Sequence, residues 1–99
     1  DGKLVTQHIM PSTAPTFPAD QWVRIEAEVR GNDEVIHRVN GVEVLRYQRP
    51  QLDPRNHISP ATDLLDAGAD LQLSSGHIAL QAEGQPVWFR KIELRRLAK

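Results

Sequence analysis

The chain has 99 residues, enough for one small domain with a thin hydrophobic core, since 39% of the residues are hydrophobic. Its 12 basic and 13 acidic residues are scattered and nearly balanced, which argues against a nucleic-acid partner. No apolar run reaches the ~20 residues of a membrane-spanning helix, and the lack of cysteine excludes disulfides and cysteine-ligated zinc.

The first third of the chain holds one weak and one strong strand pattern. Residues 3–10 alternate with mixed faces, as in an edge strand, and three prolines in residues 11–18 predict a loop. Residues 21–30 alternate strictly, which predicts a strand. Its apolar face holds Val23, Ile25, Ala27 and Val29, and its charged face holds Arg24, Glu26, Glu28 and Arg30.

Two turn signals then divide the chain into further strands. Gly31-Asn32 is a hairpin turn of the Gly-X type, and Asn40-Gly41 is the strongest short hairpin signal. Residues 33–39 and 42–48 are therefore predicted strands. Three consecutive strands joined by tight turns predict an antiparallel meander, because the chain lacks the helical spacing that a parallel sheet requires.

Residues 49–75 break the strand pattern. Three prolines in this stretch exclude a central strand. Residues 62–67 predict one or two turns of helix ended by Gly68, and residues 71–73 predict a short strand.

Residues 76–97 are predicted to form two adjacent strands, the closing hairpin of a β-sandwich. Apolar and polar residues alternate up to Glu83, and residues 84–86 supply turn chemistry. The second run is rich in β-branched and aromatic residues, but its alternation slips, which predicts a bulge near Arg90-Lys91.

The ordered motifs resemble the 3-keto-disaccharide hydrolase domain family over roughly residues 18–97. The motifs that carry the resemblance are Trp22-Val23-Arg24-Ile25, Gly31-Asn32, Asn40-Gly41-Val42-Glu43-Val44, Pro50-Gln51-Leu52-Asp53, Gly76-His77-Ile78-Ala79-Leu80-Gln81, Gln81-Ala82-Glu83 and Phe89-Arg90-Lys91-Ile92. The resemblance implies an all-β fold, a concanavalin-like jelly roll of two antiparallel sheets. It also implies action on 3-keto-glycosides and a periplasmic or extracellular location in bacteria.

The resemblance also bears on domain organisation. The family domain is roughly twice this length, an ordinary size for a sandwich. We therefore expect residues 1–99 to be either a single domain or the C-terminal part of a larger jelly-roll domain. Half a jelly roll leaves strand edges uncovered, so we expect it to join the rest of its own domain or to form a homo-oligomer.

The predicted site lies on the closing hairpin. Gln81 and Arg90 fall on neighbouring strands and offer fixed donors to sugar hydroxyls or a carbonyl oxygen. Glu83 and Arg90 are the candidate catalytic residues, with Glu83 or a distant carboxylate as acid or base. The alternative is that Arg90 only forms a surface ion pair with Glu83.

Other side chains are candidates for the same carbohydrate site. Trp88 alternates away from Phe89 and could stack on a sugar ring, while Tyr47 and Arg49 could line the rim. Glu26 and Glu28 have the same-face spacing that an inverting glycosidase could use, or they form a solvated face balanced by arginines.

The sequence leaves three classes of function open. The first is a glycoside-cleaving enzyme, the second a non-catalytic carbohydrate-binding module, and the third a structural β-sandwich half. The four histidines show no HxH or HxxxH spacing, so we expect neither a metal nor a cofactor; the alternative is that strand pairing brings histidines together in a single-metal site.

Overall fold

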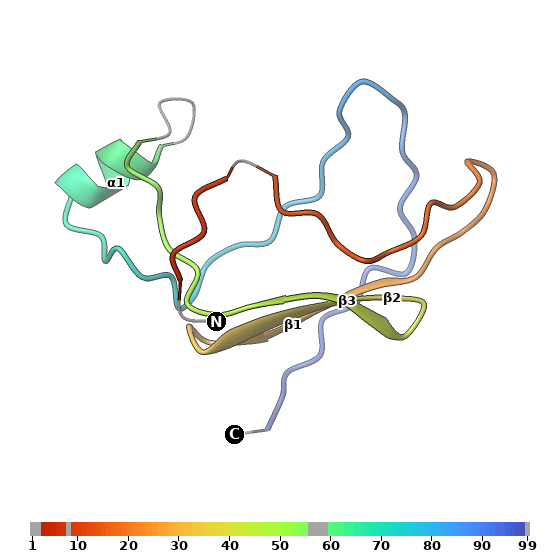
Figure 1. The fold of residues 1–99 in the computed structure, drawn as a ribbon, viewed down its shortest axis with the longest axis horizontal. Helices are drawn as coiled ribbons and strands as arrows, with labels where there is room; N and C mark the ends of the chain where they lie inside the picture. The colour runs from red at the N-terminus through yellow and green to blue at the C-terminus, as the bar shows by residue number, and fades with distance from the viewer. Residues whose placement is uncertain (1–2, 8, 56–59, 99) are drawn as a thin grey trace.

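The computed structural model describes residues 3–7, 9–55 and 60–98. Strands β1 (Ile25–Arg30), β2 (Glu34–Val39) and β3 (Val42–Tyr47) form one antiparallel sheet in the order β1-β2-β3 (Figure 1). A single short helix, α1 (Ala61–Asp66), completes the regular structure of the described residues. The predicted meander is confirmed, and the chain is an all-β domain with little helix. The predicted helix at residues 62–67 is confirmed to within one residue at each end.

Both predicted turns join the strands, but the first spans three residues, 31–33, instead of the predicted two, because Arg30 pairs with Glu34. Gly31 has φ 55°, and Asn40 and Gly41 have φ 50° and 83°, the left-handed conformation that short hairpins require at these positions. Arg24 and Asn40 then close the end of the sheet. The Arg24 N–H donates to Asn40 Oδ1 at 3.0 Å, and the Asn40 N–H donates to the Arg24 carbonyl at 2.9 Å.

A β-bulge interrupts the pairing of β2 with β3. Arg38 pairs with Glu43, but His37 pairs with Leu45, so Val44 is an extra residue. The Val44 carbonyl instead accepts a hydrogen bond from the Thr13 N–H at 2.9 Å, and the Val44 side chain is buried. The bulge therefore attaches the N-terminal segment to the sheet.

The hydrophobic core is small. Among the described residues only Val35, Ile36, Val44 and Ala61 are buried hydrophobics. Val35 and Ile36 are consecutive in β2, so they point to opposite faces of the sheet. The apolar side chains of β1 remain uncovered, and Ile25 is 75% exposed. The sheet thus has one partly covered face, and the described residues form no second sheet against it.

The closing hairpin predicted at residues 76–97 is wrong for this structure, and so is the edge strand at residues 3–10. The structure has no strand in residues 76–98, or in the described part of 3–10 (Figure 1). Strand geometry persists only where a neighbour supplies the ladder of hydrogen bonds, and alternation alone provides none. Gly84 at φ 75° and Lys91 at φ 52° also interrupt the extended backbone. The predicted bulge near Arg90-Lys91 therefore has no ladder to interrupt.

The predicted short strand at residues 71–73 exists only as a single bridge. Gln51 and Gln72 pair in antiparallel fashion, flanked by a hydrogen bond from the Leu52 N–H to the Leu71 carbonyl at 2.9 Å. Asn32 ties this region to the first turn, because its Nδ2 donates to the Pro50 carbonyl at 3.1 Å. Within the described ranges, no helix has the length and apolar character needed to cross a membrane.

Candidate functional site

One face of the sheet carries a network of ion pairs. Glu28 accepts from Arg30 Nε at 2.6 Å through Oε2 and from Arg38 Nη1 at 3.0 Å through Oε1. Hydrogen bonds from Arg30 and then Arg38 lower the pKa of Glu28 below its ordinary value. Glu26 pairs with Arg24 at 3.3 Å. Both carboxylates are thus engaged by arginines, as expected of a solvated, charge-balanced face rather than of a glycosidase pair.

Arg46 organises the other half of this charged face. It pairs with Glu34 and, at 2.6 Å through Nη2, with Glu43. The hydrogen bond from Arg46 lowers the pKa of Glu43. Ile36 lies between Glu28 and Arg46 in the register, so the charged side chains cover it. This face is therefore structural, with a buried isoleucine beneath its ion pairs.

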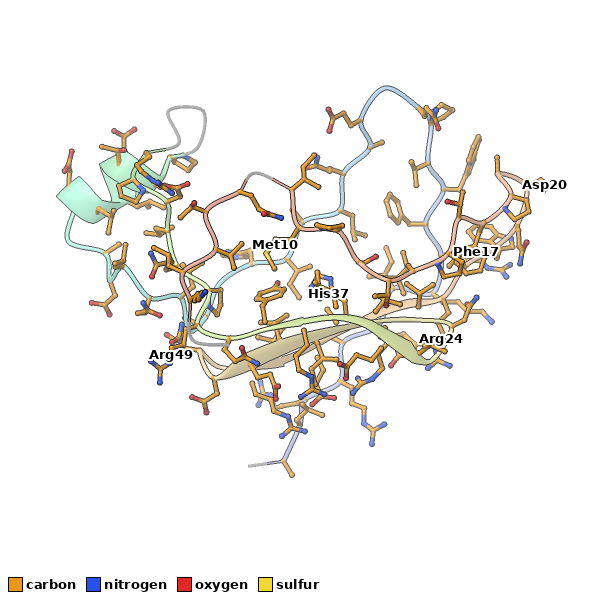
Figure 2. The ribbon with its side chains drawn as sticks, in the orientation of Figure 1. Met10, Phe17, Asp20, Arg24, His37 and Arg49 are labelled. Atoms are coloured by element: carbon orange, nitrogen blue, oxygen red, sulfur yellow. The ribbon has the colours of Figure 1, made fainter. Side chains whose placement is uncertain are left out.

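The opposite face carries a histidine–tyrosine pair. His37 Nε2 and the Tyr47 hydroxyl are 3.2 Å apart, and their rings meet edge to face with centroids 5.4 Å apart and planes at 69°. Both side chains are half-buried. Figure 2 shows His37 on the side of the sheet where Met10 and Phe17 lie.

The environment of Tyr47 favours its neutral form. Burial raises the pKa of the Tyr47 phenol above its ordinary value of about 10. Tyr47 was a predicted site residue, whereas sequence reasoning treated His37 as one of several scattered histidines. Only the register of β2 against β3 reveals the pair.

Arg49, the other predicted residue near Tyr47, is held by its main chain. It has φ 53°, and its N–H donates to the Asn32 carbonyl at 3.0 Å. Its side chain is exposed at the end of β3, opposite the end of the sheet where Arg24 lies (Figure 2).

Residues 76–97, called the closing segment from here on, are exposed and irregular, and they include several predicted site residues. Gln81 and Glu83 are exposed, and Trp88 is 74% exposed. The Arg90 guanidinium lies 4.1 Å from the centre of the Trp22 ring, a cation–π contact. No ion pair joins Glu83 to Arg90 in the part of the chain that the structure describes.

Comparison with known proteins decides the family. The family described as 3-keto-alpha-glucoside-1,2-lyase-like domain matches residues 1–95 of the 99-residue chain. The chain belongs to this family. The resemblance seen in the sequence motifs is thereby confirmed. No curated protein and no solved structure matches the chain.

In this 3-keto-alpha-glucoside-1,2-lyase-like domain, Arg90 lies far from the predicted site residues Tyr47 and Arg49. Arg90 meets Trp22 three residues before β1 begins, while Tyr47 pairs with Val35, opposite Val29 near the end of β1. At about 3.3 Å per residue these positions are roughly 20 Å apart. The structure therefore does not bring Tyr47 and Arg49 together with Arg90.

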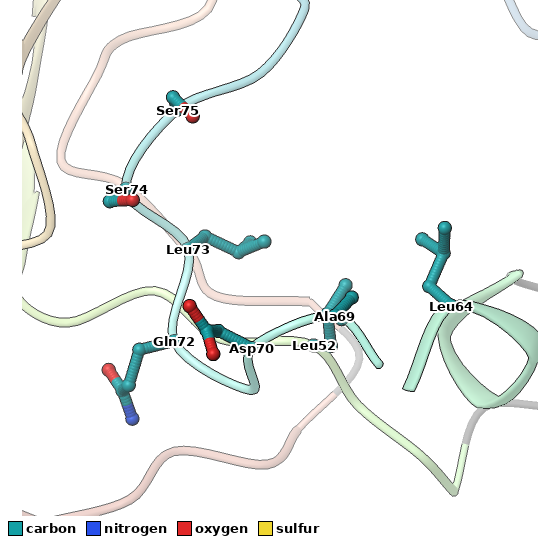
Figure 3. A pocket seen from close by; sticks show the side chains of 8 residues that line it. All are labelled: Leu52, Leu64, Ala69, Asp70, Gln72, Leu73, Ser74 and Ser75. Carbon is teal, nitrogen blue, oxygen red and sulfur yellow. The ribbon is translucent and has the colours of Figure 1, made fainter. Parts of the chain in front are cut away.

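A separate hollow of about 260 Å³ lies beside α1 (Figure 3). It is lined by Leu52, Leu64, Ala69, Asp70, Gln72, Leu73, Ser74 and Ser75. None of the predicted site residues lines it. Among the predicted site residues and the side chains that they contact, the His37–Tyr47 pair combines partial burial with two side chains that can exchange a proton.

Proposed function

We propose that this domain binds 3-keto-glycosides and cleaves their glycosidic bond. The observation that carries the proposal is the family match over residues 1–95, since the family is named for a 1,2-lyase that acts on 3-keto-alpha-glucosides. A ketone at C3 acidifies the proton on C2, and the glycosidic oxygen on C1 is then a leaving group β to the carbonyl. Cleavage therefore needs a polar face with proton-transfer groups more than it needs two opposed carboxylates.

The sugar-binding groups in this proposal are those predicted from the sequence. Tyr47 and Arg49 contact the sugar near the end of β3, while Gln81, Trp88 and Arg90 contact it or its aglycone from the closing segment, with Glu83 as an acid or base. Closing the gap between these groups requires the closing segment to move toward the sheet. Its exposure and the lack of strand pairing in residues 76–98 support that freedom.

We further propose that the sheet is one layer of a concanavalin-like jelly roll in a periplasmic or extracellular protein. The uncovered apolar side chains of β1 and of the closing segment support a second layer. That layer comes from another part of the same protein or from a second copy of the chain. Light scattering tests the second source, because a strictly monomeric chain contradicts it.

The test of the function is turnover of 3-keto-glycosides. Purified chain is incubated with methyl 3-keto-α-glucoside and, as a control ligand, with the parent methyl α-glucoside. We expect cleavage of the keto sugar alone, with an unsaturated ketone as product if cleavage is elimination and 3-keto-glucose if it is hydrolysis. Neither binding nor cleavage of the keto sugar would contradict the proposal. Binding without cleavage would leave a carbohydrate-binding module.

The role of Arg90 has its own matched control. Arg90→Ala should weaken binding of the keto sugar, whereas Arg95→Ala should not, since Arg95 lies on the same exposed segment and carries the same charge. Equal effects of the two variants would mean that general positive charge, and not the group above Trp22, attracts the ligand.

A further inference from the structure

The His37–Tyr47 pair is set apart from the other polar groups of the sheet. Its two side chains come from adjacent strands, because His37 pairs with Leu45 and Tyr47 lies two residues further along β3. Such diagonal neighbours on one face are within reach of aromatic side chains. The arginines and glutamates of the network occupy the other face, so no ion pair competes for either group.

Each member of the pair has one hydrogen-bonding position without a partner among the described residues. His37 Nε2 faces the Tyr47 hydroxyl at 3.2 Å, and Nδ1 has no hydrogen-bond partner among the described residues. If Nε2 carries the imidazole proton and donates to the Tyr47 oxygen, the phenol proton points elsewhere and Nδ1 is an acceptor. Burial raises the pKa of Tyr47, which keeps the phenol a proton donor.

We propose that His37 and Tyr47 are the acid–base pair that cleaves a 3-keto-glycoside, with His37 as the base and Tyr47 as the acid. The inference rests on the proposed function and assigns the proton transfers to His37 and Tyr47 in place of Glu83. It also places the reacting atoms on the face of the sheet that carries His37, at the end where Tyr47 lies.

The elimination balances with these two groups alone. His37 Nδ1 takes the proton from C2, and the C–H electron pair passes to the C3 carbonyl as an enolate. The enolate re-forms the ketone as the C1–C2 double bond forms, and the C1–O bond breaks with its electron pair on the leaving oxygen. Tyr47 gives its proton to that oxygen. The imidazolium then returns its Nε2 proton to the phenolate across the 3.2 Å contact, which leaves the imidazole protonated at Nδ1. Proton exchange with solvent then restores the starting form, protonated at Nε2, before the next turnover.

The experiment compares two leaving groups in three proteins. Methyl and 4-nitrophenyl 3-keto-α-glucosides are offered to the wild-type chain, to Tyr47→Phe and to His37→Gln, and proton–deuterium exchange at C2 is followed by NMR in D₂O. Tyr47→Phe should lower cleavage of the methyl glycoside by about 10²-fold or more, a typical effect of a general acid. It should lower cleavage of the nitrophenyl glycoside far less, because nitrophenolate leaves without protonation, and it should keep C2 exchange.

His37→Gln should lose C2 exchange and cleavage of both glycosides, with binding of the keto sugar retained. Ile25→Ala changes an exposed residue of β1. It is the control that shows whether substitution in the sheet by itself alters exchange or cleavage. Tyr47→Phe preserves the ring and its packing, so it remains informative even where His37→Gln fails to fold.

The outcomes separate the two proposals. If the wild-type chain cleaves the keto sugar but Tyr47→Phe cleaves both glycosides at the wild-type rate, the acid–base assignment is overturned and the proposed function stands. A rise in KM with kcat unchanged in either variant also overturns it, since that result means binding alone. If the wild-type chain neither binds nor cleaves the keto sugar, the proposed function fails and the assignment fails with it.

Discussion

Replacing Ile36 with alanine should destabilise the domain far more than the same replacement at Ile25. Both side chains are isoleucines in strands of the same sheet, but Ile36 in the central strand β2 is 4% exposed, whereas Ile25, the first residue of the edge strand β1, is 75% exposed. The change removes three carbons, and at about 0.8 kcal/mol for each buried carbon the loss at Ile36 is about 2.4 kcal/mol. Ile25 is 75% exposed, so only about a quarter of this burial energy, about 0.6 kcal/mol, is lost there.

The cavity left at Ile36 should add little to this value. Its cross-strand neighbours are the long side chains of Glu28 and Arg46, which can settle into the space more readily than packed core residues. Urea unfolding followed by circular dichroism measures both variants. With a urea m-value of about 1–2 kcal/mol/M, Ile36→Ala should lower the midpoint by about 1–2 M. Equal midpoints for the two variants would refute the conclusion that the ion-paired face shelters a core residue.

Three further predictions follow from the ion pairs, the turn and the buried phenol. Because Arg30 and Arg38 lower the pKa of Glu28, its carboxylate stabilises the fold above the ordinary glutamate pKa of about 4.3 and loses this effect as the pH falls. Glu28→Gln should therefore weaken the acid dependence of urea unfolding. Gly41→Ala should cost about 1 kcal/mol or more in the same assay, since φ is 83° although a Cβ would meet no atom within 4 Å. Tyr47 is the only tyrosine, so the tyrosinate absorbance of the folded chain should titrate above pH 10, and a midpoint at or below 10 would contradict its burial.

The central sheet could be predicted from the sequence because its information is local. Gly31 and Asn40-Gly41 adopt the left-handed backbone that their residue types favour, and strict alternation in residues 25–30 fixes which face is charged. The closing segment shows the limit of the same reasoning. Its alternation expresses a preference for a half-buried strand, but a strand also needs a neighbour to pair with. In this structure residues 76–98 pair with neither edge strand of the sheet, β1 or β3.

The candidate site was harder to predict than the sheet, because it depends on one residue of register. Regular pairing from the Asn40-Gly41 turn would place Tyr47 opposite Glu34, on the charged face and away from His37. The extra residue Val44 shifts the pairing, so that Tyr47 lies opposite Val35 and shares a face with His37. Nothing in the local sequence of residues 42–47 marks Val44 as the extra residue.

The bulge therefore links the fold to the proposed chemistry through two effects of one residue. It moves Arg46 onto the charged face, where it joins Glu34 and Glu43, and it moves Tyr47 onto the other face beside His37. The same extra residue turns its carbonyl toward Thr13, which brings the N-terminal segment over the face that holds the pair. A strand with regular alternation would keep the sheet but exchange the faces of Arg46 and Tyr47. In that arrangement the imidazole would face an arginine, and the phenol would lie among carboxylates that compete for its proton. The bulge is thus a requirement of the proposed site and more than an irregularity of the sheet.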